Sequence, residues 1–479
     1  MRLKILLIIL LTLSSWSLSA ANDRNLPSLG DYTSGIFSLD QERALGQHFL
    51  RQLRAGAPLV YDPLLQEYLE LLIYQLASNS QLQDRRIDLV IIDNKTINAF
   101  AAPGGIVGVN LGLFLYGEDV SEVSAILGHE IAHVSQRHFA RRSEAGKKAS
   151  LASTVGLLAG ILLMATNSGD AGLAALTASQ SIAQSEMLRY SRSREAEADR
   201  VGIDTLIESG MDPRAMARMF ERLNRANRYS GRDIPEFMLT HPVTKSRIAD
   251  SYAQTERLPA KIFPKDLDYQ LMRTRIQTMT TNSDSDSLIR RRSAIANGDA
   301  VTQAANLYGL ALIQTKTGQF DNAMQNIDQL RRAYPGKIAF VLAEAELHTK
   351  AERYDVAIDT LEVALNISPN NYPLSMAYAE VLMKNRQAAE AAEVLREVTK
   401  NRSNDQDVWY LLSEAYGLDR DIIGVHQARA EYFVLTGNFN QALKQLGFAI
   451  PLARDNFQEN ARITERMKEI SELISSYDR

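Results

Sequence analysis

The chain has 479 residues, of which 45% are hydrophobic and 23% are charged, so it has a globular composition and enough length for two or three domains. Its formal net charge of −4 is small for this size and lacks the basic excess of a nucleic-acid-binding protein. There is no cysteine, which excludes a cysteine protease, disulfide bonds and lipid attachment to an amino-terminal cysteine.

Residues 1–21 have the parts of a secretory signal peptide in their usual order. Basic residues precede an apolar run over 5–13, and small residues follow it up to Ala20 and Ala21. The apolar run is shorter than the roughly 20 residues of a membrane-spanning helix. We therefore expect export with cleavage after Ala20 or Ala21, rather than an uncleaved membrane anchor.

The next part of the chain predicts helices around a small sheet. Residues 40–78 have the apolar spacing of two helices, with a turn near Pro58 between them. Two β-branched runs, 87–92 and 106–109, predict strands. A further helix is expected from about Glu118.

Residues 151–166 carry almost no charge, and 171–183 carry very little. One interpretation is a pair of buried or mobile helices, and the other is a surface that contacts lipid or unfolded chains. Each half is too short for a comfortable membrane span. This favours the first interpretation and leaves peripheral membrane contact through 151–183 open.

The chain is expected to divide after the next helix. Asp212 and the proline after it predict the start of this helix, because aspartate caps helices and proline fits a first helical turn. We place one domain over 22–265, a linker or connecting helix over 266–300, and a second domain over 301–479.

The second domain has the period of a tetratricopeptide repeat array. Ala323, Ala357 and Ala391 are 34 residues apart, and small residues also stand twelve positions before each of them. Small residues at these points let the two helices of a repeat pack closely. A fourth, less regular unit is expected around Trp409. Such arrays usually bind peptides or proteins, and the alternative is a purely structural cap.

His129, Glu130 and His133 form an HExxH motif on a predicted helix. Residues i and i+4 share a helix face, so the two imidazoles can hold one metal ion. Glu130 is the residue after His129 on the helix, where it can deprotonate a water beside the metal. The motif is typical of peptidases with one Zn²⁺ per chain.

A catalytic zinc needs a third protein ligand. His138 is nine residues past His129, which points it to the opposite side of the helix, and we interpret it as a surface or core-edge residue. Glu195 and Asp199 share one face of a second predicted helix, whereas Glu197 projects away. We predict that Glu195 binds the metal and that Asp199 orients a ligand histidine.

Four segments resemble the M48 peptidases: LGHEIAHVSQRH (127–138), EAEADRVG (195–202), NAFAAPGG (98–105) and THP (240–242). With a signal peptide before and repeats after, the chain is most similar to the periplasmic members of the family that serve outer-membrane β-barrel assembly. The resemblance covers nearly the whole mature chain. It implies zinc ligation by His129, His133 and Glu195, with Glu130 as the general base.

The same resemblance implies a mainly α-helical fold, in which a zincin-like α+β metallopeptidase domain precedes a solenoid of tetratricopeptide repeats. It implies a soluble or peripheral periplasmic enzyme in quality control of outer-membrane proteins. The expected partners are unfolded or misassembled outer-membrane proteins and, through the repeats, the β-barrel assembly machinery. The rival hypothesis is a chaperone or adaptor with a latent or structural metal site. Glu130 favours the enzyme, because a structural site needs no general base.

His241 is a further candidate catalytic residue beside Glu130 and Asp199. It can stabilise the oxyanion formed during hydrolysis, or occupy the fourth zinc position and hold the enzyme off until substrate displaces it. A simple loop histidine is the remaining alternative. Arg247 is a weaker candidate as its neighbour. The strand after Gly105 is a candidate to pair with an extended substrate.

Overall fold

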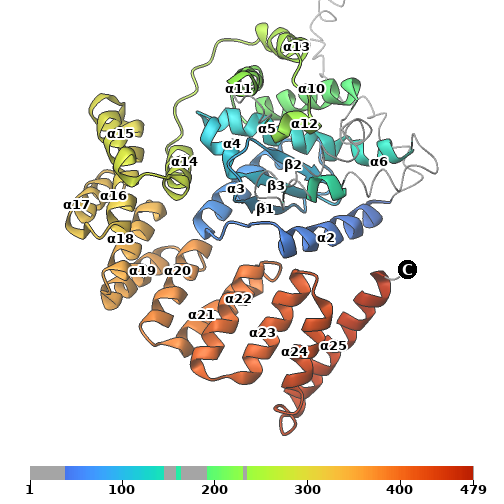
Figure 1. The fold of residues 1–479 in the computed structure, drawn as a ribbon, viewed down its shortest axis with the longest axis vertical. Helices are drawn as coiled ribbons and strands as arrows, with labels where there is room; N and C mark the ends of the chain where they lie inside the picture. The colour runs from blue at the N-terminus through green and yellow to red at the C-terminus, as the bar shows by residue number, and fades with distance from the viewer. Residues whose placement is uncertain (1–37, 145–157, 163–164, 166–190, 230–234, 478–479) are drawn as a thin grey trace, which may run out of the picture.

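The computed structural model describes residues 38–144, 158–162, 165, 191–229 and 235–477. Helices dominate these ranges, and the N-terminal half also holds a small sheet (Figure 1). The predicted fold class, an α+β domain followed by a helical array, is confirmed. The predicted signal peptide lies outside the described residues. Within the described ranges, no helix is both long and apolar enough to cross a membrane.

The N-terminal half consists of α2 (Leu39–Gly56), α3 (Pro63–Ser78), β1 (Asp88–Ile92), β2 (Ala99–Ala102), β3 (Ile106–Asn110), α4 (Leu111–Tyr116), α5 (Val120–Ser135), α6 (His138–Glu144), α10 (Arg192–Glu208), α11 (Ala215–Tyr229), α12 (Glu236–Thr240) and α13 (Lys245–Glu256). The helices predicted over 40–78 and from Glu118 are thus confirmed as α2, α3 and α5, and the helix predicted at Asp212 begins slightly later, as α11.

The C-terminal half is helical throughout its described residues. It consists of α14 (Leu267–Thr280), α15 (Asp284–Asn297), α16 (Ala300–Lys316), α17 (Phe320–Ala333), α18 (Ile338–Lys350), α19 (Tyr354–Ile367), α20 (Tyr372–Lys384), α21 (Ala388–Asn401), α22 (Gln406–Asp419), α23 (Ile422–Leu435), α24 (Phe439–Ala449) and α25 (Phe457–Tyr477).

The three strands lie in the order β1-β3-β2. β3 pairs with β1 in parallel, with Asp88 opposite Ile106, and with β2 in antiparallel, with Ala99 opposite Val109. β2 was not predicted, because four residues rich in alanine lack a strand signal. The strand after Gly105 is therefore the middle strand, so the prediction that it pairs with substrate is wrong. β2 is the edge strand on that side.

Helix α5 lies at the centre of the N-terminal half and is buried along most of its length. The Asp119 side chain caps it by accepting a hydrogen bond from the Glu122 backbone N–H. Gly128 of α5 faces Gly202 of α10, where a side chain would come within 3.1 Å of the His129 backbone nitrogen. Because glycines line this contact, the two helices approach backbone to backbone and bring their polar residues together.

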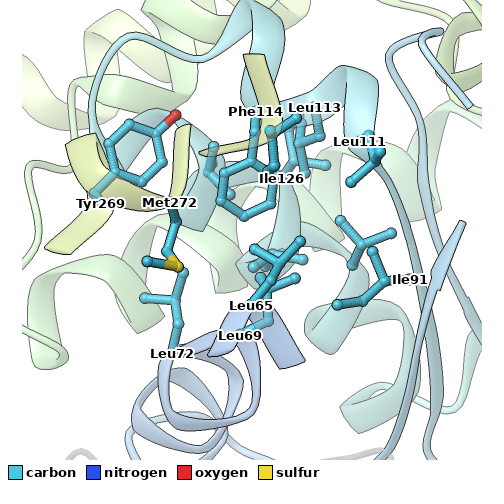
Figure 2. Packing of buried hydrophobic residues seen from close by; sticks show 14 of the residues in the cluster. Leu65, Leu69, Leu72, Ile91, Leu111, Leu113, Phe114, Ile126, Tyr269 and Met272 are labelled. Carbon is cyan, nitrogen blue, oxygen red and sulfur yellow. The ribbon is translucent and has the colours of Figure 1, made fainter. Parts of the chain in front are cut away.

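One hydrophobic core joins the N-terminal half to the first repeats. Figure 2 shows Leu65 of α3, Ile126 of α5 and Tyr269 of α14 in one cluster of buried residues, and the Tyr269 ring stacks on Phe114 with centroids 5.8 Å apart. The same cluster of buried residues continues through α16, α17 and α18. The predicted connection over 266–300 therefore contains two helices, and α14 is part of this joint core.

The repeat array has the predicted period. Ala323, Ala357 and Ala391 lie in α17, α19 and α21, and each is 0% exposed. The array curves so that α20 contacts α3, as Figure 1 shows. Arg402 at the end of α21 pairs with Glu70 of α3 at 2.7 Å. Ion pairing thus holds the middle of the array against the N-terminal half.

Of residues 151–183, which contain the two apolar runs, only a few are described. Leu158, Ile161 and Ala165 are buried in a cluster with Phe49 of α2. For these residues the buried interpretation is confirmed. The remainder of the stretch, with any membrane contact through it, lies outside the described residues.

A cavity of about 440 Å³ lies between the sheet and the array, lined by β1 and the start of α22. Burial, together with the neighbouring Asp405, raises the pKa of Asp407 to about 7. A raised carboxyl pKa stabilises the folded state at low pH, and this contribution is lost as the pH rises through the folded value.

We therefore expect Asp407→Asn to raise the free energy of unfolding at pH 8 by about 1–2 kcal/mol and to change it little at pH 4. Denaturant unfolding at the two pH values measures the effect. Asp419→Asn, an exposed change on the same helix, is the control. A gain of equal size at both pH values contradicts the prediction.

Candidate metal centre

Three helices bring four metal-binding side chains together. His129 and His133 of α5 have their Nε2 atoms 3.0 Å apart. Glu195 of α10 places Oε1 3.4 Å from the His133 Nε2 and Oε2 3.6 Å from the His129 Nε2. His241, just after α12, places Nδ1 3.1 Å from the Glu195 Oε1 and 3.3 Å from the His129 Nε2. All four side chains are buried.

These donor atoms fit a zinc ion in both chemistry and spacing. They all lie within 4.8 Å of one another. Ligand atoms of a tetrahedral zinc site with bonds of about 2.0–2.1 Å are roughly 3.4 Å apart, and the separations given above range from 3.0 to 3.6 Å. Two histidines and one carboxylate are a common donor set of catalytic zinc. The structure therefore brings the three predicted ligands together and places His241, the candidate for the fourth position, beside them.

Asp199 lies beside His129. Its Oδ1 lies 2.9 Å from the His129 Nδ1, which leaves Nε2 facing the other donors. Arg247 holds Asp199 with hydrogen bonds of 2.7 and 2.6 Å, and its Nη1 lies 2.7 Å from the Glu195 Oε2. Burial opposes the charge of Arg247, but the two carboxylates outweigh it and raise its pKa.

His138 is 0% exposed, so the predicted location at the surface or core edge is wrong. Helix α5 ends at Ser135, and Arg137 has a left-handed backbone with φ of 51°, which turns the chain back toward the site. The His138 Nδ1 lies 2.8 Å from the His133 Nδ1, and its Nε2 lies 3.0 Å from Glu197. Burial lowers the pKa of His138 to about 4.

Glu130 faces the donor set from α5. Its Oε2 accepts a hydrogen bond of 2.9 Å from the backbone N–H of Ala101 in β2. Its Oε1 is buried, has no hydrogen-bond partner among the described residues, and lies 3.5 Å from the His241 Nε2. Burial raises the pKa of Glu130. A carboxylate with a raised pKa and a free oxygen is suited to accept a proton.

The short helix α12 carries His241 to the site and is held by Glu236. The Glu236 carboxylate accepts hydrogen bonds from the side-chain amides of Asn94, Asn98 and Asn110, at 3.1, 3.2 and 3.3 Å. All three donors are neutral, so no ion pair to these partners fixes α12 in place.

A family model described as Peptidase family M48 matches residues 63–253, and a tetratricopeptide repeat model matches 348–415. The β-barrel assembly-enhancing protease of Escherichia coli (strain K12) is 32% identical over 448 residues, covering 94% of this chain and 91% of that protein. The chain belongs to peptidase family M48. The β-barrel assembly-enhancing protease of Yersinia pestis is 32% identical, over 94% of this chain and 92% of its own. Mitochondrial metalloendopeptidase OMA1 of Bos taurus is 33% identical, over 32% of this chain and 29% of its own.

This M48 metallopeptidase therefore joins a peptidase domain to tetratricopeptide repeats. Several polar residues around its site were not assigned from the sequence. Arg247 was ranked low because it acts on Asp199, which lies 48 residues earlier in the chain. Glu236 was missed because its partners are neutral amides. The NAFAAPGG segment, which contains Asn98, was the available signal for that contact.

Proposed function

We propose that this M48 peptidase binds one Zn²⁺ per chain through His129, His133 and Glu195, and hydrolyses peptide bonds of unfolded or misassembled outer-membrane proteins. The supporting observation is the set of buried donor atoms beside the unpartnered oxygen of Glu130. Zinc bound there polarises the scissile carbonyl and makes the attacking water more acidic.

The remaining chemistry belongs to side chains of this protein. Glu130 accepts the proton of the attacking water on Oε1 and delivers it to the leaving amine, while the Ala101 N–H fixes its other oxygen. Asp199, held by Arg247, keeps the His129 Nε2 facing the metal. The edge strand β2 lies beside Glu130 and offers backbone groups to an extended substrate, which favours unfolded segments.

His241 is proposed to occupy the fourth metal position when no substrate is bound. Its Nδ1 is as close to Glu195 and His129 as the other donors are to each other, and its Nε2 faces Glu130. A side chain in this place excludes the attacking water and the substrate carbonyl. This geometry favours the blocking role over stabilisation of the oxyanion, and it requires α12 to move before cleavage.

We expect His241→Ala to cleave an unfolded β-barrel protein about tenfold faster than wild type while keeping its zinc, because three ligands remain and the closed state is lost. Initial cleavage rates and zinc content measure this. His48→Ala, an exposed histidine of α2, is the control. Slower cleavage by His241→Ala with full zinc content supports the oxyanion role instead, and a zinc chelator is expected to stop cleavage by both proteins.

The proposed location is the periplasm, reached through a signal peptide over 1–21. The proposed domains are the peptidase domain over 22–265 and the repeats over 301–479, joined by 266–300. The repeats are proposed to recruit clients or the β-barrel assembly machinery. The support is similarity along 94% of the chain to relatives named for assembly of β-barrels. A second candidate function, chaperone or adaptor, is favoured by the position of His241, which closes the site.

A further inference from the structure

We propose that His138 is a positioning residue for the metal centre, linking the ligand His133 to the carboxylate of Glu197. In this arrangement His133 donates from Nδ1 to His138, and His138 donates from Nε2 to Glu197. The inference rests on the proposed zinc ligation by His133.

The directions of these hydrogen bonds follow from the last member of the chain. A carboxylate only accepts, so the His138 Nε2, 3.0 Å from Glu197, carries the hydrogen. The Nδ1 of a neutral His138 is then a lone pair, and it lies 2.8 Å from the His133 Nδ1. His133 must therefore carry its own hydrogen on Nδ1. Its Nε2 is left with the lone pair that a metal requires, 3.0 Å from the His129 Nε2.

Glu197 is itself held in place. The Arg141 Nη1 donates to its two carboxylate oxygens at 3.3 and 3.1 Å. The two proposed ligand histidines therefore have equivalent surroundings, because each is linked to a carboxylate of α10 that pairs with an arginine. For His129 the link to Asp199 is direct, and for His133 it passes through His138.

This link has a measurable consequence for the metal. An imidazole tied to a carboxylate holds one tautomer and is a stronger ligand, and loss of such a partner typically lowers metal affinity about 10–100-fold. The test compares zinc affinities of the full mature chain, measured by competition with a chromophoric chelator. His138→Leu removes the acceptor, whereas His138→Asn keeps an amide oxygen near the position of Nδ1.

We expect His138→Leu to bind zinc about 10–100-fold more weakly than wild type, and His138→Asn to stay within about threefold. In the zinc-loaded, ¹⁵N-histidine-labelled protein, the exchange-protected Nδ1–H signal of His133 is expected in wild type and His138→Asn and absent in His138→Leu. His348→Leu, a buried histidine of the repeats, is the matched control with unchanged affinity.

Wild-type affinity in His138→Leu overturns the inference, and so does an equal loss in the Leu and Asn variants, which indicates a purely structural role. If His138→Leu does not fold, the zinc affinity of Glu197→Gln is the test, because glutamine keeps a hydrogen-bond acceptor but removes the negative charge. A severalfold weaker affinity supports the link, and an unchanged one overturns it. His133→Ala separates the two proposals. If His133→Ala keeps the wild-type zinc affinity, the proposed ligation by His133 is wrong. If His133→Ala loses zinc affinity and His138→Leu does not, only the proposed role of His138 is wrong.

Discussion

Replacing Glu130 by glutamine is expected to lower cleavage by about 10²–10⁴-fold while leaving zinc bound. Glutamine has nearly the same shape and can still accept the Ala101 N–H, but it cannot take a proton from water. The measurement is the initial rate on an unfolded β-barrel protein together with zinc content. It is made in the His241→Ala background, so that opening of the site does not limit the rate. Glu208→Gln, an exposed change on α10, is the control.

This experiment also separates the two candidate functions. Cleavage by Glu130→Gln at close to the parent rate contradicts the proposed proton transfer. If wild type and His241→Ala both hold zinc and neither cleaves, the peptidase proposal for this site is lost. Suppression of client aggregation by wild type and Glu130→Gln alike then supports the chaperone or adaptor.

Glu195→Gln is expected to lose most of its zinc, whereas Glu197→Gln retains it at one ion per chain. Glu195 supplies a charged oxygen to the donor set, and a neutral amide is a much weaker zinc ligand. Its removal also leaves the buried Arg247 with Asp199 as its one remaining carboxylate partner among the described residues. Glu197 lies two residues along the same helix and contacts His138 rather than the donor atoms, which makes it the matched control.

Zinc content after gel filtration measures this difference, with circular dichroism to show that both variants remain folded. Glu197→Gln is expected to weaken affinity severalfold, which does not empty the site at stoichiometric zinc. Equal loss of zinc from both variants contradicts the assignment of Glu195 as the third ligand.

The parts of the site that the sequence predicted are those set by helix periodicity. His129 and His133, like Glu195 and Asp199, are four residues apart, and the helices expected to carry them are present as α5 and α10. Local geometry therefore placed each pair on one face. It could not show that the two glycine-lined helices meet, which is what brings the pairs together.

The wrong or missing parts depend on where the chain bends. His138 was placed by continuing a helix that ends at Ser135. The strand order is a tertiary property, so β3 was taken for an available strand although β2 covers its edge. His241 and Arg247 were candidates from the sequence, but their contacts with Glu195 and Asp199 depend on the path of α12 and α13, which residue spacing does not show.

The shared core of the two halves has a consequence for folding. Tyr269 of α14 is fully buried against the peptidase side, and the same apolar cluster extends to Leu347 of α18. Truncation after residue 265 therefore does not separate two complete domains, because it removes α14 and the first repeats from the hydrophobic core that supports α5. We therefore expect the peptidase half and the first repeats to unfold in a single transition. During synthesis from the N-terminus, a chain that ends before the repeats is expected to lack part of the hydrophobic core that supports α5.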